Sequence, residues 1–363
     1  MSEPSQPINV ADYERLAAEK LEPGAHGYFA GGAGDERTLR DNVEAFGRWQ
    51  LRPRVLVDVG EATARTTVLG TEISMPLLVA PVAFQRLADP EGEPGMAKAA
   101  TAVGTIFCLS SIASASPREV AEAAPDGARW LQLYCFKDRG VTRSLIDEAV
   151  DCGFSAIALT VDAPRAGRRE RDFRTGFEVP AGVSVPAIEA AVGAPTPMTP
   201  QEVFALVDPT LTWHDLSSLA SECPLPILVK GVHTGEDARL AVEHGAAGVV
   251  VSNHGGRQLD TVPASLDMLP EVAEAVEGRA EVLMDGGIRR GTDVVTARAL
   301  GAGAVLAGRA PLWGLAVGGV DGAQRVLEIL RDEIELALCL SGCPTPEHVT
   351  RNHVQRPPYI RDS

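Results

Sequence analysis

The chain contains 363 residues, 45% of them hydrophobic, and carries a formal net charge of −16 with a pI near 4.9. One large catalytic domain can bury a core of this size, and the acidic balance argues against nucleic acid or an anionic membrane surface as a partner, because like charges repel. The six cysteines lack paired metal-ligand spacing in a chain too long to need disulfides, which indicates free thiols, a cytoplasmic location and no bound metal.

Residues 1–75 are predicted to form a helical preface. The start, MSEPSQPINV, lacks the apolar core of a signal peptide, and no run of about 18 apolar residues occurs, so neither secretion nor a membrane span is expected. The run VADYERLAAEKL, from Val10, has the spacing of an amphipathic helix, and the Gly-rich stretch AGGAGDE, from Ala30, interrupts the pattern. We expect this preface to cap the fold that follows rather than to form a separate domain.

Eight short apolar runs rich in β-branched residues come after the preface. They are LLVAPV from Leu77, TIFCLSS from Thr105, WLQLY from Trp130, AIALTVD from Ala156, ILVKGV from Ile227, AGVVVSN from Ala247, EVLMDGG from Glu281 and AVLAGR from Ala304. Alanine-rich segments of helical period, such as GEDARLAVEHGA, lie between them, as in repeated βα units. This alternation predicts an α/β fold of the (β/α)8 TIM-barrel type, with an open doubly wound sheet as the competing architecture.

The connection between the fourth and fifth predicted strands is much longer than the others. Its part from about 176 to 209 is rich in Pro, Ala and Gly. A connection of this length in a compact barrel is usually a mobile or partly disordered lid. We therefore expect a single domain over residues 1–363, in which the barrel spans 76–340 and a C-terminal tail spans 341–363.

Polar side chains close or follow the predicted strands. In a barrel of this kind the chemistry gathers at the carboxyl ends of the strands, although a single Ser or Thr there more often caps a neighbouring backbone group. The residues concerned are Ser110, Gln132, Tyr134, Thr160, Asp162, Lys230, His254, Arg257, Asp285 and Arg309. Their shared position predicts that they line one mouth of the barrel.

The last two predicted strands run into MDGGIRRGTD and AGRAP. Glycines there allow backbone N–H groups to approach a ligand, and the guanidinium groups of Arg289 and Arg309 match phosphate oxygens. Barrels often hold a phosphate at this place. The alternative interpretation is that the glycines make tight turns and the arginines are solvated.

Two further groups suggest redox or acid–base chemistry. Lys230 ends an apolar strand, where it could form a Schiff base, offset a carboxylate or stabilise negative charge on a cofactor. His254 and Arg257 fit a shared task, in which a base takes a proton while a guanidinium grips a carboxylate. Asp162 could orient His254 or could simply cap a loop. The other histidines lack such neighbours and are interpreted as surface or core residues.

Several motifs together resemble the FMN-dependent 2-hydroxy-acid oxidase and dehydrogenase family, which includes glycolate oxidase, lactate oxidase and mandelate dehydrogenases. The resemblance covers most of the chain. It is carried by YFAGGAGDERTL, PVAFQRLADPEGE, LQLYCFKDR, LTVDAPRAGRRERD, ILVKG, SNHGGRQLD, MDGGIRRGTD, AGR, LSGC and TRNHV, in this order. It implies a TIM barrel that holds FMN over its mouth, and a homotetramer.

The resemblance also implies roles for individual residues. His254 would be the active-site base, paired with Asp162, and Arg257 would anchor the substrate carboxylate beside Tyr28. Tyr134 would hydrogen-bond the substrate hydroxyl. Arg169 would be a second, mobile cation, and Lys230 would favour the anionic reduced flavin ring. The implied cofactor contacts are Pro81, Val82, Ala83, Ser110, Gln132, Thr160, Lys230, Ser252, Asp285, Gly286, Gly287, Arg289, Gly308 and Arg309.

The implied reaction is oxidation of an (S)-2-hydroxy acid to a 2-keto acid, with two electrons passing to FMN. Transfer as a proton or as a hydride stays open. A flavin-binding scaffold without turnover is the alternative outside enzymes, and a phosphate-binding barrel isomerase is a minor rival that leaves Arg257 unused. Ala83, where oxidase-like members tend to carry Ala, favours molecular oxygen as acceptor over a dehydrogenase with another acceptor.

The substrate is expected to be larger than glycolate. Ile112 stands where glycolate-oxidase-like members carry Trp, and Ala166 stands where they carry Leu, so both should enlarge the pocket. The motif PVAFQRLADPEGE is also closer to hydroxymandelate-oxidase-like members. We therefore expect a substrate of the mandelate or 4-hydroxymandelate class. The alternative is that Phe84 or the lid refills the space and that lactate or glycolate is preferred.

Overall fold

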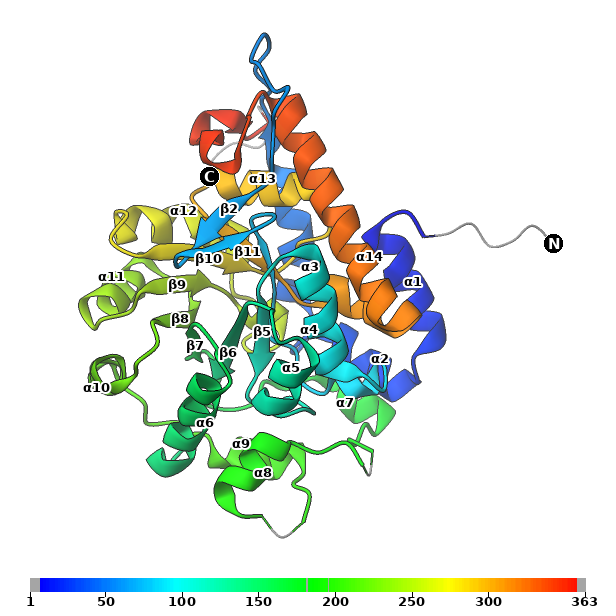
Figure 1. Cartoon of the computed structure of the whole chain (residues 1–363), viewed down its shortest axis with the longest axis vertical. Coiled ribbons are helices and arrows are strands. Elements are labelled where there is room, and N and C mark those ends of the chain that lie inside the picture. Colours follow the sequence, from blue (N-terminus) through cyan, green and yellow to red (C-terminus); the bar gives the residue numbers. More distant parts are fainter. Residues whose placement is uncertain (1–6, 181, 195, 358–363) are drawn as a thin grey trace, which may run out of the picture.

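A closed barrel of eight parallel strands forms the centre of the computed structural model, which describes residues 7–180, 182–194 and 196–357 (Figure 1). The strands are β4 (Leu77–Val79), β5 (Phe107–Ser110), β6 (Arg129–Leu133), β7 (Ile157–Thr160), β8 (Ile227–Val232), β9 (Gly248–Val251), β10 (Glu281–Asp285) and β11 (Ala304–Ala307). They follow one another around the ring in chain order, and β11 pairs with β4 to close it. Each strand coincides with one of the predicted runs, so the predicted barrel is confirmed and the open sheet is excluded.

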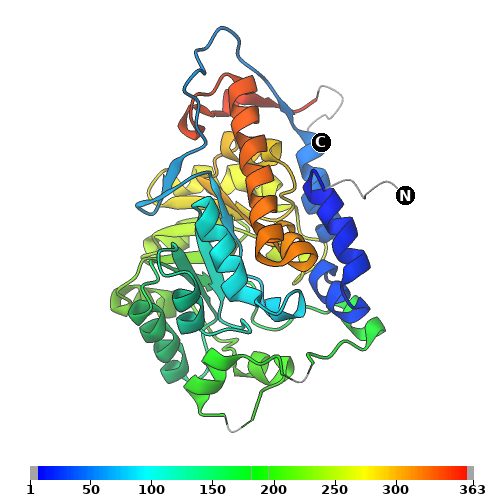
Figure 2. The same ribbon diagram turned by 45° about the vertical axis from the view of Figure 1, so that its right-hand side comes forward.

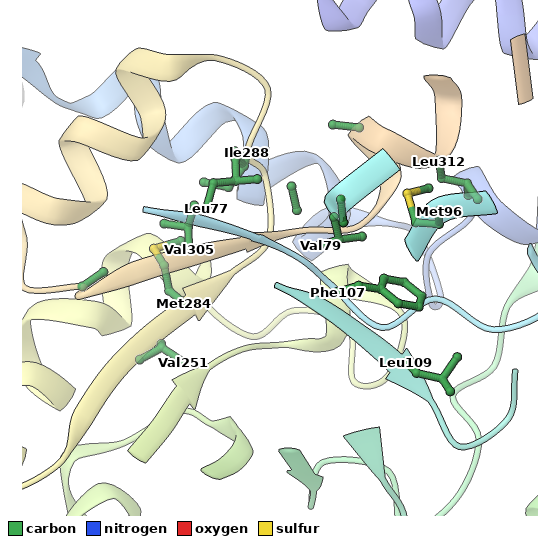
Figure 3. Packing of buried hydrophobic residues seen from close by; sticks show 14 of the residues in the cluster. Leu77, Val79, Met96, Phe107, Leu109, Val251, Met284, Ile288, Val305 and Leu312 are labelled. Atoms are coloured by element: carbon green, nitrogen blue, oxygen red, sulfur yellow. The ribbon is translucent and has the colours of Figure 1, made fainter. Parts of the chain in front are cut away.

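Helices cover the outer face of the barrel. They are α4 (Gly92–Val103), α5 (Pro117–Ala123), α6 (Arg139–Asp151), α10 (Trp213–Glu222), α11 (Gly235–Glu243), α12 (Ser265–Val276), α13 (Gly291–Ala299) and α14 (Arg309–Ser341). Leu77, Val79 and Phe107 share an apolar cluster with Met96 of α4, between the strands and this outer layer (Figure 3). Burial of such side chains on both faces explains why the strands read as continuous apolar runs.

Alternate residues of the strands face the interior of the barrel. Cys108, Trp130, Leu228 and Leu283 belong to this inner apolar cluster. Residues two positions apart on a strand point to the same side, so the next inward positions follow at the carboxyl ends of the strands. Those positions carry Ser110, Gln132, Thr160, Lys230, Ser252 and Asp285. The inward-facing positions are therefore apolar along the inside of the barrel and polar at the carboxyl ends of the strands, where they form the mouth.

The preface is helical only in its first part. Helices α1 (Val10–Lys20), α2 (Pro23–Ala30) and α3 (Arg37–Glu44) confirm that part, and α1 lies along α14 (Figure 2). The prediction is wrong for the remainder, which forms β1 (Gln50–Leu51), β2 (Thr66–Val68) and β3 (Thr71–Ile73). Strand β1 pairs with β12 (Val354–Gln355) in the C-terminal tail. Residues 1–6, at the start of the predicted preface, and residues 358–363 of the predicted tail lie outside the described residues.

Strands β2 and β3 form a hairpin at the amino-terminal end of the barrel. Leu69 and Gly70 at its turn have φ angles of 44° and 76°, the left-handed geometry that suits the twist of a two-residue hairpin. Val68 and Ile73 join the inner apolar cluster, and the Leu69 N–H donates to Glu281 at the start of β10. The hairpin therefore closes the end of the barrel opposite to the polar mouth.

The long connection after β7 contains three short helices where the structure describes it. It contains α7 (Glu170–Thr175), α8 (Pro186–Val192) and α9 (Pro200–Leu206), and α8 and α9 lie together at one edge of the molecule (Figures 1 and 2). Its end is attached to the loop after β6, where Lys137 N–H donates to the Leu206 carbonyl. In the described residues no helix has both the length and the apolar run that a bilayer crossing requires.

Candidate active site

One cavity at the polar mouth brings most of the predicted site residues together. The predicted residues that line it are Tyr28, Pro81, Val82, Ala83, Ser110, Ile112, Gln132, Tyr134, Thr160, Arg169, Lys230, His254, Arg257, Asp285, Gly286, Gly287, Arg289, Gly308 and Arg309. Asp162 and Ser252 do not line it but hydrogen-bond to His254 and Lys230, which do. Ala166 is exposed and outside the lining, so the structure does not support a role for it in pocket volume.

His254 lies in a turn with unusual backbone geometry. His254, Gly255 and Gly256 have φ angles of 59°, 62° and 74°. A left-handed residue other than Gly is strained, and such strain persists only where the surroundings hold it in place. Here the Ser252 hydroxyl accepts from the His254 N–H at 3.0 Å, and the Asn253 side chain accepts from the Gly256 N–H at 3.1 Å. The turn therefore presents the His254 ring to the cavity in a fixed orientation.

Asp162 holds the ring of His254 from the side away from the cavity. Its Oδ1 lies 3.0 Å from His254 Nδ1. Burial acts to raise the pKa of Asp162, but the interaction with His254 and the charge of Lys230 keep this pKa below its usual value. The ionised carboxylate places a proton on Nδ1 and leaves Nε2 available as a base. Gly231 makes this approach possible, because a Cβ there would lie 2.6 Å from the Asp162 Cβ.

Lys230 forms a buried ion pair inside the mouth. Its Nζ lies 3.0 Å from Asp285 Oδ2 and donates to the Ser252 hydroxyl at 3.0 Å. Burial acts to lower the pKa of Lys230, but Asp285 and Asp162 raise it above its usual value, so the ammonium stays charged. Oδ1 of Asp285 is buried without a hydrogen-bond partner among the described residues. The pair therefore offers a fixed positive charge and one free acceptor.

Arg257 and Arg169 are two cations on one aromatic ring. Their guanidinium carbons lie 5.0 Å and 5.6 Å from the ring centre of Tyr28. Arg257 donates to the backbone carbonyls of Tyr28 and Gly31 at 2.6 Å and 3.0 Å, and no carboxylate of the described residues pairs with it. Burial, followed by the charge of Arg169, lowers the pKa of Arg257 to about 10. A carboxylate ligand would supply the missing negative charge.

A second group of cations lies at the ends of β10 and β11. Arg309 donates to the carbonyls of Phe29, Gly255 and Gly31 at 2.8 Å, 3.0 Å and 2.8 Å. Burial, with the charges of Arg257 and Arg289, lowers the pKa of Arg309 to about 9. Arg289 has only a weak ion pair, at 3.4 Å to Glu14. These under-compensated guanidinium groups beside Gly308 could hold a phosphate-like anion.

A chain of polar side chains crosses the floor of the mouth from β5 to β7. The Ser110 hydroxyl donates to Gln132 Oε1 at 3.1 Å, and Gln132 Nε2 donates to the Thr160 hydroxyl at 3.0 Å. Tyr134 follows Gln132 and is buried, and burial together with the negative charge of Asp162 raises its pKa, so the phenol stays protonated. The mouth therefore offers fixed donors and acceptors on one side and cations on the other.

Three aromatic residues that were not predicted as site residues line the cavity, namely Phe29, Phe84 and Phe204. Phe204 of α9 lies 5.9 Å from Tyr134 between ring centres, and Phe84 lies 5.9 Å from Tyr28. The apolar run VFAL in a Pro-rich connection is the signal that could have placed Phe204 on a buried helix face. A neighbouring cavity between β7, β8 and α10 shares Thr160 but has Asp208 and Asp237 in its lining and no Lys or Arg, which does not suit an anion.

Known proteins resemble this chain over nearly its whole length. The family described as FMN-dependent dehydrogenase matches residues 17–356. Glycolate oxidase 3 of Arabidopsis thaliana is 49% identical over 352 residues, which cover 96% of this chain and 95% of the relative. L-lactate oxidase of a Nostoc species is 50% identical over 348 residues, with 93% and 95% covered. A solved structure of mandelate oxidase with benzoyl-formic acid is 39% identical, with a TM-score of 0.88 and coverage of 96% and 98%.

Proposed function

Because the chain belongs to the FMN-dependent dehydrogenase family, we propose that it oxidises an (S)-2-hydroxy acid to the 2-keto acid and passes the electrons to molecular oxygen, giving hydrogen peroxide. The observation that carries this proposal is the placement of His254, Arg257 and Tyr134 around one cavity, with a fixed ammonium on Lys230 beside it. A base, a carboxylate anchor and a hydroxyl partner are what oxidation of a 2-hydroxy acid requires.

The residues present fit FMN. Arg309 and Arg289 suit its phosphate, since both are cations that the described protein groups compensate poorly. Asp285 retains a free buried acceptor that suits a hydroxyl of the ribityl chain, and Lys230 suits an electron-rich edge of the ring. We propose the other predicted cofactor contacts for the same reason, because most of them line the same cavity. Ser252 does not line it but accepts a hydrogen bond from Lys230, which does. When bound, FMN supplies the two-electron acceptor.

We propose that the chain's own groups bind, orient and deprotonate the substrate. Arg257 pairs with the substrate carboxylate, with Arg169 as the second cation and the Tyr28 ring as their shared support. Tyr134, protonated at neutral pH, interacts with the substrate hydroxyl. Nε2 of His254 takes the proton, and the ionised Asp162 stabilises the imidazolium that results. Lys230 keeps its charge throughout and offsets the negative charge that arrives with the electrons.

For the substrate we propose the mandelate or 4-hydroxymandelate class. Ile112 is 2% exposed and lines the cavity, and the aromatic rings of Tyr28, Phe84 and Phe204 surround the same space, which suits an aromatic side chain. The mandelate oxidase structures favour the same class. Ala166 is exposed and outside the cavity lining, so it does not enlarge the cavity.

A lactate- or glycolate-sized acid is the second candidate. Phe84 and Phe204, the latter in the long connection after β7, both line the cavity, which supports the alternative that these elements refill the space beside Ile112. The glycolate and lactate oxidases among the relatives favour this smaller class.

One set of assays tests these proposals. The purified protein is expected to be yellow, and its colour should bleach when a 2-hydroxy acid is added without oxygen. Values of kcat/KM for glycolate, lactate, 2-hydroxyoctanoate and mandelate rank the substrate classes, and glycolate in first place would refute the larger substrate. Stoichiometric hydrogen peroxide in air supports oxygen as acceptor, whereas fast turnover only with a dye or quinone supports a dehydrogenase. Yellow protein that no hydroxy acid bleaches would be a flavin-binding scaffold.

We also propose that the chain forms a homo-oligomer, a tetramer by resemblance, and that it acts in the cytoplasm. The segment between β1 and β2 projects from the molecule (Figure 1), and its Val55 and Leu56 are 82% and 104% exposed. Exposed apolar side chains grouped in this way are typical of contact surfaces. The six cysteines, all free thiols, suit a reducing compartment. Light scattering after size exclusion and cell fractionation test the two proposals.

A further inference from the structure

Helix α7, which directly precedes the predicted lid, carries a carboxylate next to the proposed substrate cation Arg169. Asp172 lies one turn after Arg169, and its Oδ2 is 3.2 Å from Arg169 Nε. Both side chains are mostly buried, at 18% and 19% exposure. Of the carboxylates in the described residues, only Asp172 comes within ion-pair distance of Arg169. Nothing in the roles proposed above accounts for a negative charge at this place.

The ion pair uses one edge of the guanidinium. The contact involves Nε, and within the described residues no ion pair or hydrogen bond occupies the two terminal amino groups of Arg169, a residue that lines the cavity. Nε of Arg169 is buried without a hydrogen-bond partner, because its contact with Asp172 Oδ2 lacks the alignment of a hydrogen bond. The other carboxylate oxygen, Oδ1 of Asp172, is also buried without a partner among the described residues. A small rotation of Arg169 would align the contact of Nε with Oδ2, and site contacts that are loose without substrate commonly tighten when substrate binds.

Asp172 also offsets a repulsion between the two substrate cations. Arg169 and Arg257 lie over the same ring, that of Tyr28. The charge of Arg169 acts to lower the pKa of Arg257, whereas the charge of Asp172 acts to raise it. Without Asp172 nothing would offset the repulsion between the two guanidinium groups. Arg169 stands at the N-terminus of the short helix α7, so its side chain is the one that could turn away.

Helix α7 itself is anchored independently of Asp172. Arg171 pairs with Glu36 at 2.6 Å, and the Gly34 N–H donates to the Arg168 carbonyl at 3.0 Å. Phe177, just beyond the helix, stacks on Tyr28 with ring centres 5.1 Å apart. Loss of the Asp172 charge is therefore expected to free the Arg169 side chain and to leave the helix in place.

We propose that Asp172 is a positioning residue, which holds Arg169 by its Nε edge beside Arg257 so that the terminal amino groups of Arg169 can bind the substrate carboxylate. The inference rests on the proposed 2-hydroxy-acid substrate but not on the identity of its side chain. It predicts that Asp172 affects binding of the carboxylate much more than the chemical step, because Asp172 reaches the substrate only through Arg169.

The test is a titration of the oxidised holoenzyme with the 2-keto acid product, followed by the absorbance of the bound FMN. Asp172→Ala should raise the Kd about tenfold, the size expected for loss of one charge-assisted contact, and Asp172→Asn should raise it less, because its amide oxygen can still accept from Nε. The rate of anaerobic FMN reduction at saturating substrate should change by less than about threefold. Glu170→Ala, which removes a carboxylate from the same helix that pairs with the exposed Arg174, is the matched control and should bind like the parent.

A double-mutant cycle separates positioning from a merely structural role. In an Arg169→Met background, Asp172→Ala should no longer raise the Kd, and Kd values for the neutral 2-keto amide should be alike in all variants. Unchanged or tighter binding by Asp172→Ala and Asp172→Asn would overturn the inference, as would a full effect in the Arg169→Met background. A parent enzyme that binds no 2-keto acid would refute the proposed function itself, and the inference with it.

Discussion

At the scale of single residues, the site depends on buried charges whose partners differ. Lys230 has a carboxylate at 3.0 Å and needs no ligand to stay charged. Arg257 has two backbone carbonyls and a neighbouring cation instead, so its charge lacks compensation until an anion binds. This contrast supports the permanent electrostatic role proposed for Lys230 and the binding role proposed for Arg257.

Replacement of His254 tests the base. His254→Ala should retain FMN, because neither the Lys230 ion pair nor the guanidinium groups of Arg289 and Arg309 involve the imidazole. Flavin reduction should slow by about two orders of magnitude or more, which is the range for loss of a general base. Stopped-flow absorbance without oxygen measures the rate. Reduction at the parent rate would remove His254 from the mechanism.

Replacement of Arg257 tests the carboxylate anchor. Arg257→Lys keeps the charge but cannot donate to the Tyr28 and Gly31 carbonyls and also present a fork to a carboxylate. We expect KM to rise by about tenfold or more, in line with loss of a charge-assisted contact, and kcat to change less. Steady-state kinetics with the best substrate of the panel distinguish the two. A fall in kcat alone, with KM unchanged, would contradict an anchoring role.

Sequence reasoning placed most of these residues because they share one physical rule. Inward positions of the strands recur every second residue, so polar residues at strand ends had to meet at one mouth. The rule does not extend to loops. Ala166 lies beyond the end of β7 and proves to be exposed, and Phe204 reaches the cavity from a lid helix whose docking depends on contacts far apart in the chain.

At the scale of elements, buried strands were easier to predict than short exposed ones. Each barrel strand is apolar on both faces, which leaves a continuous signal in the sequence. Strands β2 and β3 have three residues each and include exposed positions, so the run TTVLGTEI gave a weak signal. Its turn at Leu69 and Gly70 uses left-handed geometry, and Leu is an uncommon residue there. The division into preface, barrel, lid and tail within one domain stays a prediction.

The loop after β5 and helix α9 both contribute to the walls of the pocket, through Ile112 and Phe204. Ile112→Trp should fill the space that an aromatic substrate uses, so kcat/KM for mandelate should fall at least tenfold while that for lactate changes less than about threefold. Val192→Ala, on lid helix α8 and outside the cavity lining, is the control. Equal losses for both substrates would show that Ile112 does not set the size limit.

At the scale of the whole molecule, the acidic exterior contrasts with a cationic interior at the mouth. The formal net charge is −16, yet burial and the nearby charges of Arg257 and Arg289 lower the pKa of Arg309. Concentrated positive charge in a folded protein is unfavourable unless an anion compensates it. The stability of the fold should therefore depend on the bound cofactor.

Removal of FMN tests this dependence. FMN at about a hundred times its Kd should stabilise the fold by about 2.7 kcal/mol, which corresponds to roughly 3–4 °C in Tm for a chain of this size. Inorganic phosphate should restore part of the loss in the FMN-free protein, and chloride at equal ionic strength should not. Arg309→Met should abolish the effect of phosphate. A Tm that is the same with and without FMN would contradict cofactor-dependent stability.

The hairpin of β2 and β3 determines by which end of the barrel small molecules can reach the cavity. Val68 and Ile73 seal its amino-terminal end with apolar side chains, so a small acid cannot pass along the barrel axis. Substrate must therefore enter, and keto acid must leave, by the same mouth. The product has to dissociate before the next substrate molecule can bind. Accumulated product should therefore inhibit in competition with fresh substrate. Movement of helices α8 and α9 would then limit both the entry of substrate and the release of product.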